Sequence, residues 1–275
     1  KIDVKSEVDN MDIWLPENIR AAIDGKPFEV DNVGMSDSSV YMFDDMVLKI
    51  QNHSRETENE YAVLHCLAQT IPTPRILLYE IANGKVYCLM SRLEGRMACD
   101  EIYLNDPELL LEVIAGAFKL LWSVDIEDCP CIQTLDVKLE MARYNVENGL
   151  VDTENAEPDT FGENGFKSPR HLLEWLEKNR PDEDDPVFSH GDMCLPNIFA
   201  DGSKITGFID FGRAGIADRW QDIALCYRSL IHNFEGRYNG GHQYKGFSPD
   251  MLFEKLGIEP DREKLRYYIL LDELF

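Results

Sequence analysis

Apolar and polar positions change their spacing about a third of the way along the chain. Early runs alternate as β-strands do, a single helical repeat follows, and two more strand-like runs are joined at Asn83-Gly84, a strong hairpin turn signal. Small residues from Gly34 to Ser39 predict a turn between the first two strands. The runs are, in order, 28–51 (three strands), 54–69 (helix), 75–81 and 85–90 (two strands). The first part of the chain therefore predicts the order β-β-β-α-β-β.

Helical spacing dominates the rest of the chain. Asp106 and Pro107 are a cap and a first-turn proline for a long helix. Its apolar positions predict a core-facing stripe: Leu110, Val113, Ile114, Ala117, Phe118 and Leu121. Further helices are expected at 136–148, 169–179 and 218–231 and near the C-terminus, with a polar acidic loop at 151–169. We therefore expect a β-rich lobe (1–90), a connector (91–95) and a mainly helical lobe (96–275).

Composition narrows the partners that the chain can have. Its 275 residues carry a formal net charge of −24, which disfavours nucleic acid and acidic membrane surfaces and favours polycations. The alternative is that the acidity serves solubility alone. The seven cysteines are irregularly spaced, and the chain shows neither a signal-like start nor an apolar run of membrane-spanning length. We expect a cytoplasmic protein with reduced thiols; no feature sets an oligomeric state.

One stretch carries a motif with chemistry. His190, Gly191 and Asp192 are followed five residues after the aspartate by Asn197, and an Asp-Phe-Gly triplet begins at Asp210. Protein kinases have His-Arg-Asp, four intervening residues, Asn and later Asp-Phe-Gly in the same order. Either triplet alone would be weak evidence, but both together with the asparagine predict phosphoryl transfer.

Phosphoryl transfer assigns these residues distinct roles. Asp192 is expected to orient and deprotonate the attacking hydroxyl, and Asn197 and Asp210 to hold Mg²⁺ against nucleotide phosphates. The alternative for each aspartate alone is a turn cap. His190 is expected to pack and hydrogen-bond within the loop. Asp222 either steadies the loop backbone or is an ordinary charge at a helix N-terminus.

A kinase also needs a strand lysine and a helical acid upstream. Lys49 lies in an alternating run, and Glu60 on the next helix is the favoured partner over Glu56 and Glu58, because it adjoins apolar positions that face the sheet. The alternative for Lys49 is an exposed strand lysine. The loop before this strand lacks the Gly-x-Gly-x-x-Gly pattern, but its backbone and Ser36 are candidates for phosphate contacts.

These motifs lie in a sequence that resembles the aminoglycoside phosphotransferases, most closely the 3'-phosphotransferases of Gram-positive type. The resemblance spans nearly the whole chain. The segments that carry it are "GMS", "LK" at Lys49, "IPTPRIL", "DIEDCP", "FSHGD…NIF", "GFIDFGRAG" and the terminal "YYILLDELF". It implies an α+β, protein-kinase-like bilobed fold with a nucleotide-binding β-rich lobe. It also implies transfer of the ATP γ-phosphate to a hydroxyl, the 3'-hydroxyl, of a cationic antibiotic, with Mg²⁺, conferring resistance.

The resemblance also implies roles for further residues. Lys49 would contact the α- and β-phosphates. The adenine site would be formed by Val47, Met90, Ser91 and Leu93. The antibiotic would be bound by Asp159, Glu163, Arg213, Asp272, Glu273 and the carboxylate of Phe275. This sequence departs from close relatives at three positions. Val47 stands where relatives have an aromatic residue that stacks on adenine, and Leu195 where they have an acidic residue in the catalytic loop. Gly162 stands where they have a glutamate in the acidic loop.

Three interpretations follow: an aminoglycoside kinase, a kinase-like enzyme for another hydroxyl substrate (choline-like, macrolide or sugar), and a pseudokinase that binds nucleotide without turnover. The intact Lys49, Asp192, Asn197 and Asp210 argue against the pseudokinase. The acidic C-terminus favours a polyamine over a neutral substrate.

Overall fold

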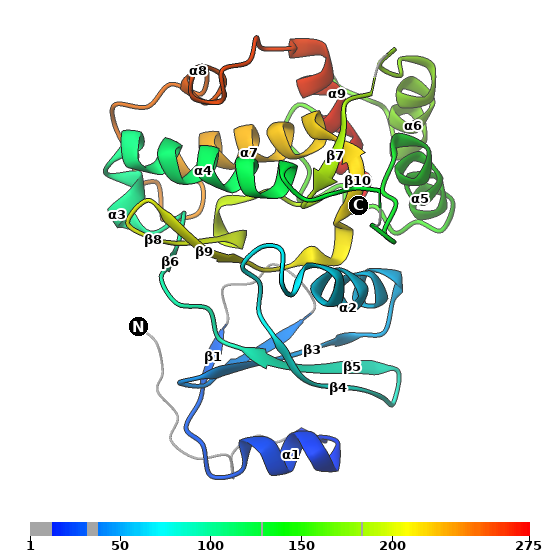
Figure 1. Cartoon of the computed structure of the whole chain (residues 1–275). Helices are drawn as coiled ribbons and strands as arrows, with labels where there is room; N and C mark the ends of the chain where they lie inside the picture. The colour runs from blue at the N-terminus through cyan, green and yellow to red at the C-terminus, as the bar shows by residue number, and fades with distance from the viewer. Residues whose placement is uncertain (1–12, 32–37, 128, 183) are drawn as a thin grey trace.

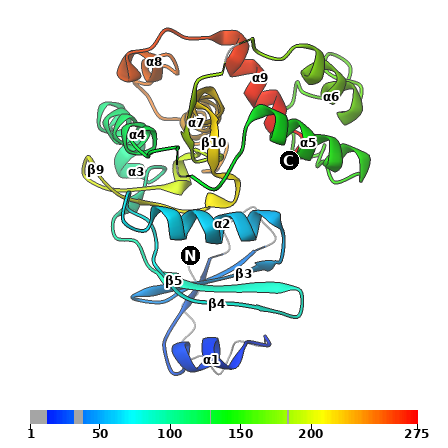
Figure 2. The same cartoon turned by 45° about the vertical axis from the view of Figure 1, so that its right-hand side comes forward.

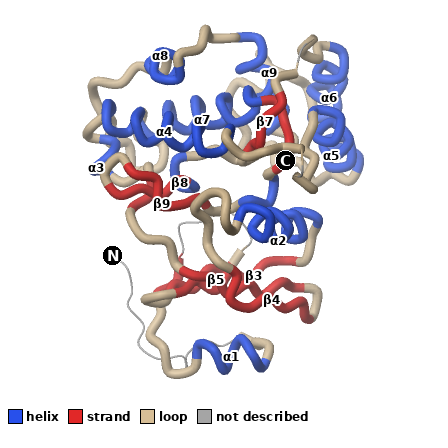
Figure 3. Tube along the Cα trace, in the orientation of Figure 1, coloured by secondary structure: helices blue, strands red, loops and turns tan. Residues whose placement is uncertain are grey.

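The chain folds into two lobes, which lie one above the other in Figure 1. The computed structural model describes residues 13–31, 38–127, 129–182 and 184–275. Figure 3 shows that the long strands gather in the lower lobe and that the upper lobe is mainly helical. The architecture is the mixed α+β, bilobed arrangement expected from the sequence.

The lower lobe is built on one antiparallel sheet of five strands in the order β1-β2-β3-β5-β4. The strands are β1 (Glu29–Asp31), β2 (Ser39–Met42), β3 (Met46–Asn52), β4 (Ile76–Ala82) and β5 (Lys85–Ser91). The hairpin between β4 and β5 turns at Asn83 and Gly84, whose φ angles of 53° and 73° suit a tight turn. The predicted order of elements is confirmed, while residues 34–37 of the predicted turn lie outside the described part of the chain.

Helix α2 (Arg55–Leu67) lies between this sheet and the upper lobe, as Figures 1 and 2 both show. It begins where the sequence predicts, because Ser54 and Thr57 form a reciprocal capping box. The opposite face of the sheet is covered by α1 (Glu17–Ile23), which the sequence analysis does not assign. This helix has only 7 residues, and Ile19 and Ile23 give it too short an apolar repeat to be read from spacing.

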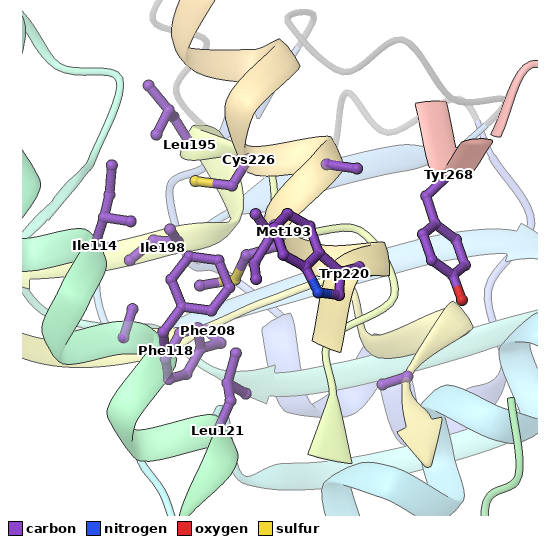
Figure 4. Close-up of a cluster of buried hydrophobic side chains, with 14 of the residues drawn as sticks. Ile114, Phe118, Leu121, Met193, Leu195, Ile198, Phe208, Trp220, Cys226 and Tyr268 are labelled. Carbon is purple, nitrogen blue, oxygen red and sulfur yellow. The ribbon is translucent and has the colours of Figure 1, made fainter. Parts of the chain in front are cut away.

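The upper lobe contains two helices of 16 residues each, and both bury side chains in the same hydrophobic cluster. Its helices are α3 (Glu101–Leu104), α4 (Pro107–Trp122), α5 (Leu135–Glu147), α6 (Pro169–Lys178), α7 (Arg219–Phe234), α8 (Met251–Leu256) and α9 (Arg262–Asp272). The predicted α4 stripe is confirmed, since all six of its side chains are fully buried. In Figure 4, Ile114, Phe118 and Leu121 from this stripe share one cluster with Leu195 and Cys226. Within the described residues, no helix is both long and apolar enough to cross a membrane.

The helical lobe also contains short strands that the sequence analysis does not assign. They form a sheet in the order β6-β8-β9 and a pair β7-β10. Their bounds are β6 (Arg96–Met97), β7 (Pro186–Ser189), β8 (Ile198–Asp201), β9 (Lys204–Phe208) and β10 (Gly215–Asp218). β7 ends directly before the His-Gly-Asp triplet, and β9 ends two residues before Asp210. The two motif loops are therefore held at both ends by paired strands.

Candidate active site

The His-Gly-Asp loop makes a turn that only glycine accommodates at its centre. Gly191 has a φ of +81°, in the left-handed region that L side chains rarely adopt. A Cβ atom at this position would lie 1.9 Å from the carbonyl oxygen of Arg213. The loop thus passes directly over the segment that follows Asp210, which explains why Gly191 stands where protein kinases have arginine.

Asp222, in the first turn of α7, holds the backbone of this loop. Its carboxylate accepts hydrogen bonds from the backbone N–H groups of His190 at 2.7 Å and Gly191 at 2.9 Å. Burial raises the pKa of Asp222, while His190 and these hydrogen bonds oppose that increase. The His190 ring lies 2.9 Å from the Ile209 carbonyl oxygen and packs on Phe211. His190 therefore packs and hydrogen-bonds within the loop, as expected. Asp222 steadies the loop backbone, which is one of its two expected roles.

Asp192 is oriented by Asn197. The Asn197 Nδ2 atom donates to the Asp192 carbonyl oxygen at 2.9 Å and to its carboxylate at 3.0 Å. Met193 and Leu195, between them, are fully buried in the helical core, which anchors the loop (Figure 4). Leu195 therefore contributes to the core and is not exposed on the surface of the loop.

Lys49 connects the two lobes. On β3, its Nζ lies 3.2 and 3.1 Å from the two carboxylate oxygens of Glu60 on α2, and 2.5 Å from Oδ1 of Asp210. Burial alone would lower the pKa of Lys49, but the two carboxylates outweigh it and raise that pKa. Burial also opposes ionisation of Asp210, yet Lys49 holds the pKa of Asp210 below its usual range. The Lys49–Glu60 pair predicted from the sequence is present, whereas Glu56 pairs with Arg213 and Glu58 with His53.

The Asp-Phe-Gly segment is also tied to α2 through its backbone. Asp210 has a φ of 63°, unusual for a residue other than glycine. Asn59 on α2 donates from Nδ2 to the carbonyl oxygens of Ala214 at 2.8 Å, Gly212 at 3.1 Å and Phe211 at 3.4 Å. Helix α2 therefore fixes the position of the segment that carries Asp210.

The residues expected around adenine lie at the end of the sheet. Val47 and Met90 are paired neighbours on β3 and β5, and Val47 packs against a small apolar cluster that contains Met90. The Ser91 N–H donates to the Arg75 carbonyl oxygen at 2.9 Å, and the Ser91 hydroxyl accepts from the Arg75 N–H. The Leu93 side chain packs on Gly207 of β9. Ser36, expected near the phosphates, lies outside the described residues.

Two of the acids expected to bind the antibiotic, Asp272 and Glu273, are already paired with arginines. Asp272 accepts from Arg213 at 3.2 Å and also pairs with Arg228 of α7. Burial would raise the pKa of Asp272, but Arg228 and Arg213 outweigh it and hold that pKa below its usual range. Arg213 in turn donates to Glu56 of α2 at 3.0 Å. A chain of ion pairs thus runs from the lower lobe to the end of α9.

This chain of ion pairs continues into the acidic loop. Glu273 accepts from Arg228 at 3.1 Å and from the backbone N–H of Glu157 at 3.0 Å, so α9 holds the loop at its base. Farther along the loop, the side chains of Asp159 and Glu163 are exposed. Asp159 lines a cavity of about 420 Å³ between the loop, α6 and α9. Of the acids expected at the antibiotic, these two have the exposed carboxylates.

Comparison with known proteins agrees with this geometry. The phosphotransferase enzyme family matches residues 29–256. The aminoglycoside 3'-phosphotransferase of Enterococcus faecalis is 39% identical over 258 residues, which cover 89% of this chain and 92% of the relative. That of Staphylococcus aureus is 38% identical over 257 residues, again 89% and 92% of the two chains.

The chain belongs to the phosphotransferase enzyme family. Among solved members, an aminoglycoside 3'-phosphotransferase of type VIII superposes with a TM-score of 0.78 at 28% identity, covering 94% of this chain and 97% of that one. An aminoglycoside phosphotransferase from Streptomyces rimosus, solved with ADP and streptomycin, gives 0.74 at 25% identity, covering 93% and 95%. The resemblance identified from the motifs and the bilobed kinase-like fold are both confirmed.

Three residues of this phosphotransferase's site were missed by the sequence analysis. The Asn59 side chain bonds to backbone carbonyls, Arg228 bonds to acids at the end of another helix, and Lys138 is buried near Arg213. Each contacts groups far away in the sequence, so no local spacing reveals them. The one available signal is that Arg228 lies in an otherwise apolar helical stretch, where a charged residue needs a partner.

Proposed function

We propose that this protein transfers the γ-phosphate of ATP to a hydroxyl group, the 3'-hydroxyl, of an aminoglycoside, and thereby confers resistance. The proposal rests on two observations: Lys49 and Asp210 meet across the lobes, and the Asp192 carboxylate is oriented by Asn197. The names of relatives up to 39% identical support the acceptor class. The S. rimosus structure with ADP and streptomycin supports a nucleotide and an aminoglycoside as the two ligands.

In this reaction Asp192 accepts the proton of the attacking hydroxyl. The acceptor oxygen forms its bond to the γ-phosphorus as the bond from that phosphorus to the β,γ-bridging oxygen breaks, and ADP leaves. Lys49 contacts the α- and β-phosphates and is positioned by Glu60. The adenine site is assigned to Val47, Met90, Ser91 and Leu93, and a phosphate contact is assigned to the hydroxyl of Ser36.

The residues present fit Mg²⁺. The Asn197 Nδ2 is engaged by Asp192, which leaves the amide oxygen as the ligand, and Asp210 offers a half-exposed carboxylate. Two oxygen side chains together with phosphate oxygens are a usual magnesium set. When bound, Mg²⁺ neutralises charge on the phosphates. Asn197 and Asp210 would hold it.

The acceptor pocket is assigned to the acidic loop and the end of α9. Exposed Asp159 and Glu163 would meet the ammonium groups directly. Asp272 and Glu273 are engaged by arginines, so we propose that they act chiefly by placing Arg213 and the loop base. Phe275 would close one side of the pocket.

The test is a phosphorylation assay with purified protein, ATP and Mg²⁺. A kanamycin-class acceptor should gain one phosphate by mass spectrometry, whereas a matched analogue without the 3'-hydroxyl should bind without gaining phosphate at that ring. Asp192→Asn should lower kcat by about 10²–10⁴-fold, because it removes the general base. ADP binding by calorimetry should be retained in this variant. Phosphorylation of a choline-like, macrolide or sugar acceptor in place of the aminoglycoside would reassign the substrate.

A further inference from the structure

Lys138 is a buried lysine without an acidic partner. It lies in the first turn of α5 and is 3% exposed, and its ammonium group makes no salt bridge or hydrogen bond with any other described residue. The charged groups that face it are Arg213, Asp272, Glu56 and Asp222, from four different elements. Burial and Arg213 lower the pKa of Lys138 to about 8, although the three carboxylates oppose them. Burying a cation without an ion-pair partner destabilises the folded protein, so a compensating contact or role is expected for Lys138.

The contact that Lys138 does make is with an aromatic ring. Its Nζ lies over the Phe275 ring at 5.4 Å from the centroid, and the guanidinium carbon of Arg213 lies over the same ring at 5.2 Å. Both distances are within the range of cation–π attraction. Two turns farther along α5, Asn145 donates to the Leu274 carbonyl oxygen at 2.9 Å. Helix α5 therefore holds the segment that follows α9 at two points.

This segment adjoins the groups assigned to the acceptor. Asp272 positions Arg213, Glu273 holds the base of the acidic loop, and α5 itself leads into that loop. The nucleotide contacts, in contrast, come from β3 and the Asp-Phe-Gly segment. A loss of order at Phe275 would therefore disturb the acceptor side first.

We propose that Lys138 is a positioning residue for the acceptor pocket, whose ammonium group attracts the Phe275 ring and so holds the segment from Asp272 to Phe275 beside Arg213. The inference rests on the proposed function, since the pocket is the one assigned to the aminoglycoside. It adds a residue that touches neither substrate and acts through Phe275. A neutral side chain of equal size would fill the same space but would not attract the ring.

A double-mutant cycle tests this directly. Lys138→Met removes the charge at similar volume, Phe275→Leu removes the ring, and the double variant removes both. Each single variant should raise KM for a kanamycin-class acceptor by roughly three- to tenfold, as expected for loss of a cation–π contact. Values of kcat and of KM for ATP should stay within about twofold. In the double variant, Lys138→Met should add little to the effect of Phe275→Leu.

Two further variants separate charge from packing. Lys138→Arg keeps the cation and should restore KM for the acceptor to within about twofold of the wild type. Lys119→Met, an exposed lysine on α4, is the surface control and should change nothing. If Lys138→Met does not fold, the comparison of wild type with Lys138→Arg from pH 7.5 to 9 replaces it. The wild-type KM should rise more over this range because arginine stays charged, while titration of the acceptor amines affects both proteins equally.

Other results would overturn the inference. These are additive effects in the cycle, a Lys138→Arg variant as impaired as Lys138→Met, equal losses for ATP and the acceptor, or equal pH responses of wild type and Lys138→Arg. Failure of the proposed function would look different, because the wild-type protein itself would then neither bind nor phosphorylate a kanamycin-class acceptor.

Discussion

At the scale of single residues, the proposed catalytic groups lie on loops that are held by contacts distant in the sequence. Asp192, Asn197 and Asp210 could be proposed from the sequence because carboxylates and an amide recur at intervals that phosphoryl transfer uses. The reason for Gly191 is not visible in this way, because it depends on the Arg213 carbonyl oxygen, which only the folded chain brings within 1.9 Å of its missing Cβ. The burial of Lys138 could not be predicted from the sequence either. A lysine near the start of a helix is normally exposed, so its burial follows from tertiary packing.

The lowered pKa of Lys138 predicts a pH-dependent stability. The folded protein releases this proton at about pH 8, and the unfolded chain holds it to about pH 10.5. Between these values the unfolded state binds more protons, so the contribution of Lys138 to stability rises with pH and is lost as pH falls through 8. From pH 7 to 9.5 the free energy of unfolding of the wild type should gain about 1–3 kcal/mol relative to Lys138→Met.

Urea denaturation of both proteins at each pH measures this difference. Taking the difference cancels the tyrosines and other groups that titrate in the same range in both proteins. A difference that stays constant across the range would mean that Lys138 keeps an ordinary pKa in the folded state.

At the scale of elements, helix α2 joins the two lobes through one polar face. Glu56, Asn59 and Glu60 are spaced three and four residues apart and therefore point the same way. They bond to Arg213, to the carbonyls after Asp210 and to Lys49, respectively. The sequence predicts the helix from its apolar repeat and Glu60 from its place beside that repeat. It does not predict the roles of Glu56 and Asn59, because their partners lie in the other lobe.

Asn59 provides the test of this coupling. Asn59→Ala leaves three carbonyl groups without their shared donor and should lower the free energy of unfolding by about 1–3 kcal/mol. It should also raise KM for ATP, because the segment that carries Asp210 is no longer fixed to α2. Glu58→Ala, on the exposed side of the same helix, is the matched control and should change stability by less than about 0.5 kcal/mol. Equal effects of the two substitutions would show that α2 is held by its apolar face alone.

At the scale of the whole molecule, the longer elements were predictable, whereas the short elements and the contacts between lobes were not. Long alternating and helical repeats specify the five-stranded sheet, α2, α4 and α7, because burial of one face dictates their spacing. The strands β6 to β10 are too short to show a repeat, and they are defined by partners elsewhere in the chain. The charge of −24 is likewise readable from composition, but the structure shows that Asp272 and Glu273 are partly neutralised by Arg213 and Arg228. The remaining acidity is spread over the surface, where it acts at long range.

Long-range attraction of a polycationic acceptor should therefore depend on salt. The Debye length is about 20 Å at 20 mM ionic strength and about 7 Å at 200 mM, so added salt screens distant carboxylates much more than contacts inside the pocket. We expect kcat/KM for a kanamycin-class acceptor to fall roughly three- to tenfold over this range, because capture is accelerated by the field of the whole protein. The value of kcat at saturating acceptor should change by less than about twofold, since chemistry follows capture. An acceptor with fewer ammonium groups is the matched control and should show a shallower decrease. If both acceptors decrease equally, or neither does, the net charge serves solubility and capture depends on the pocket residues alone.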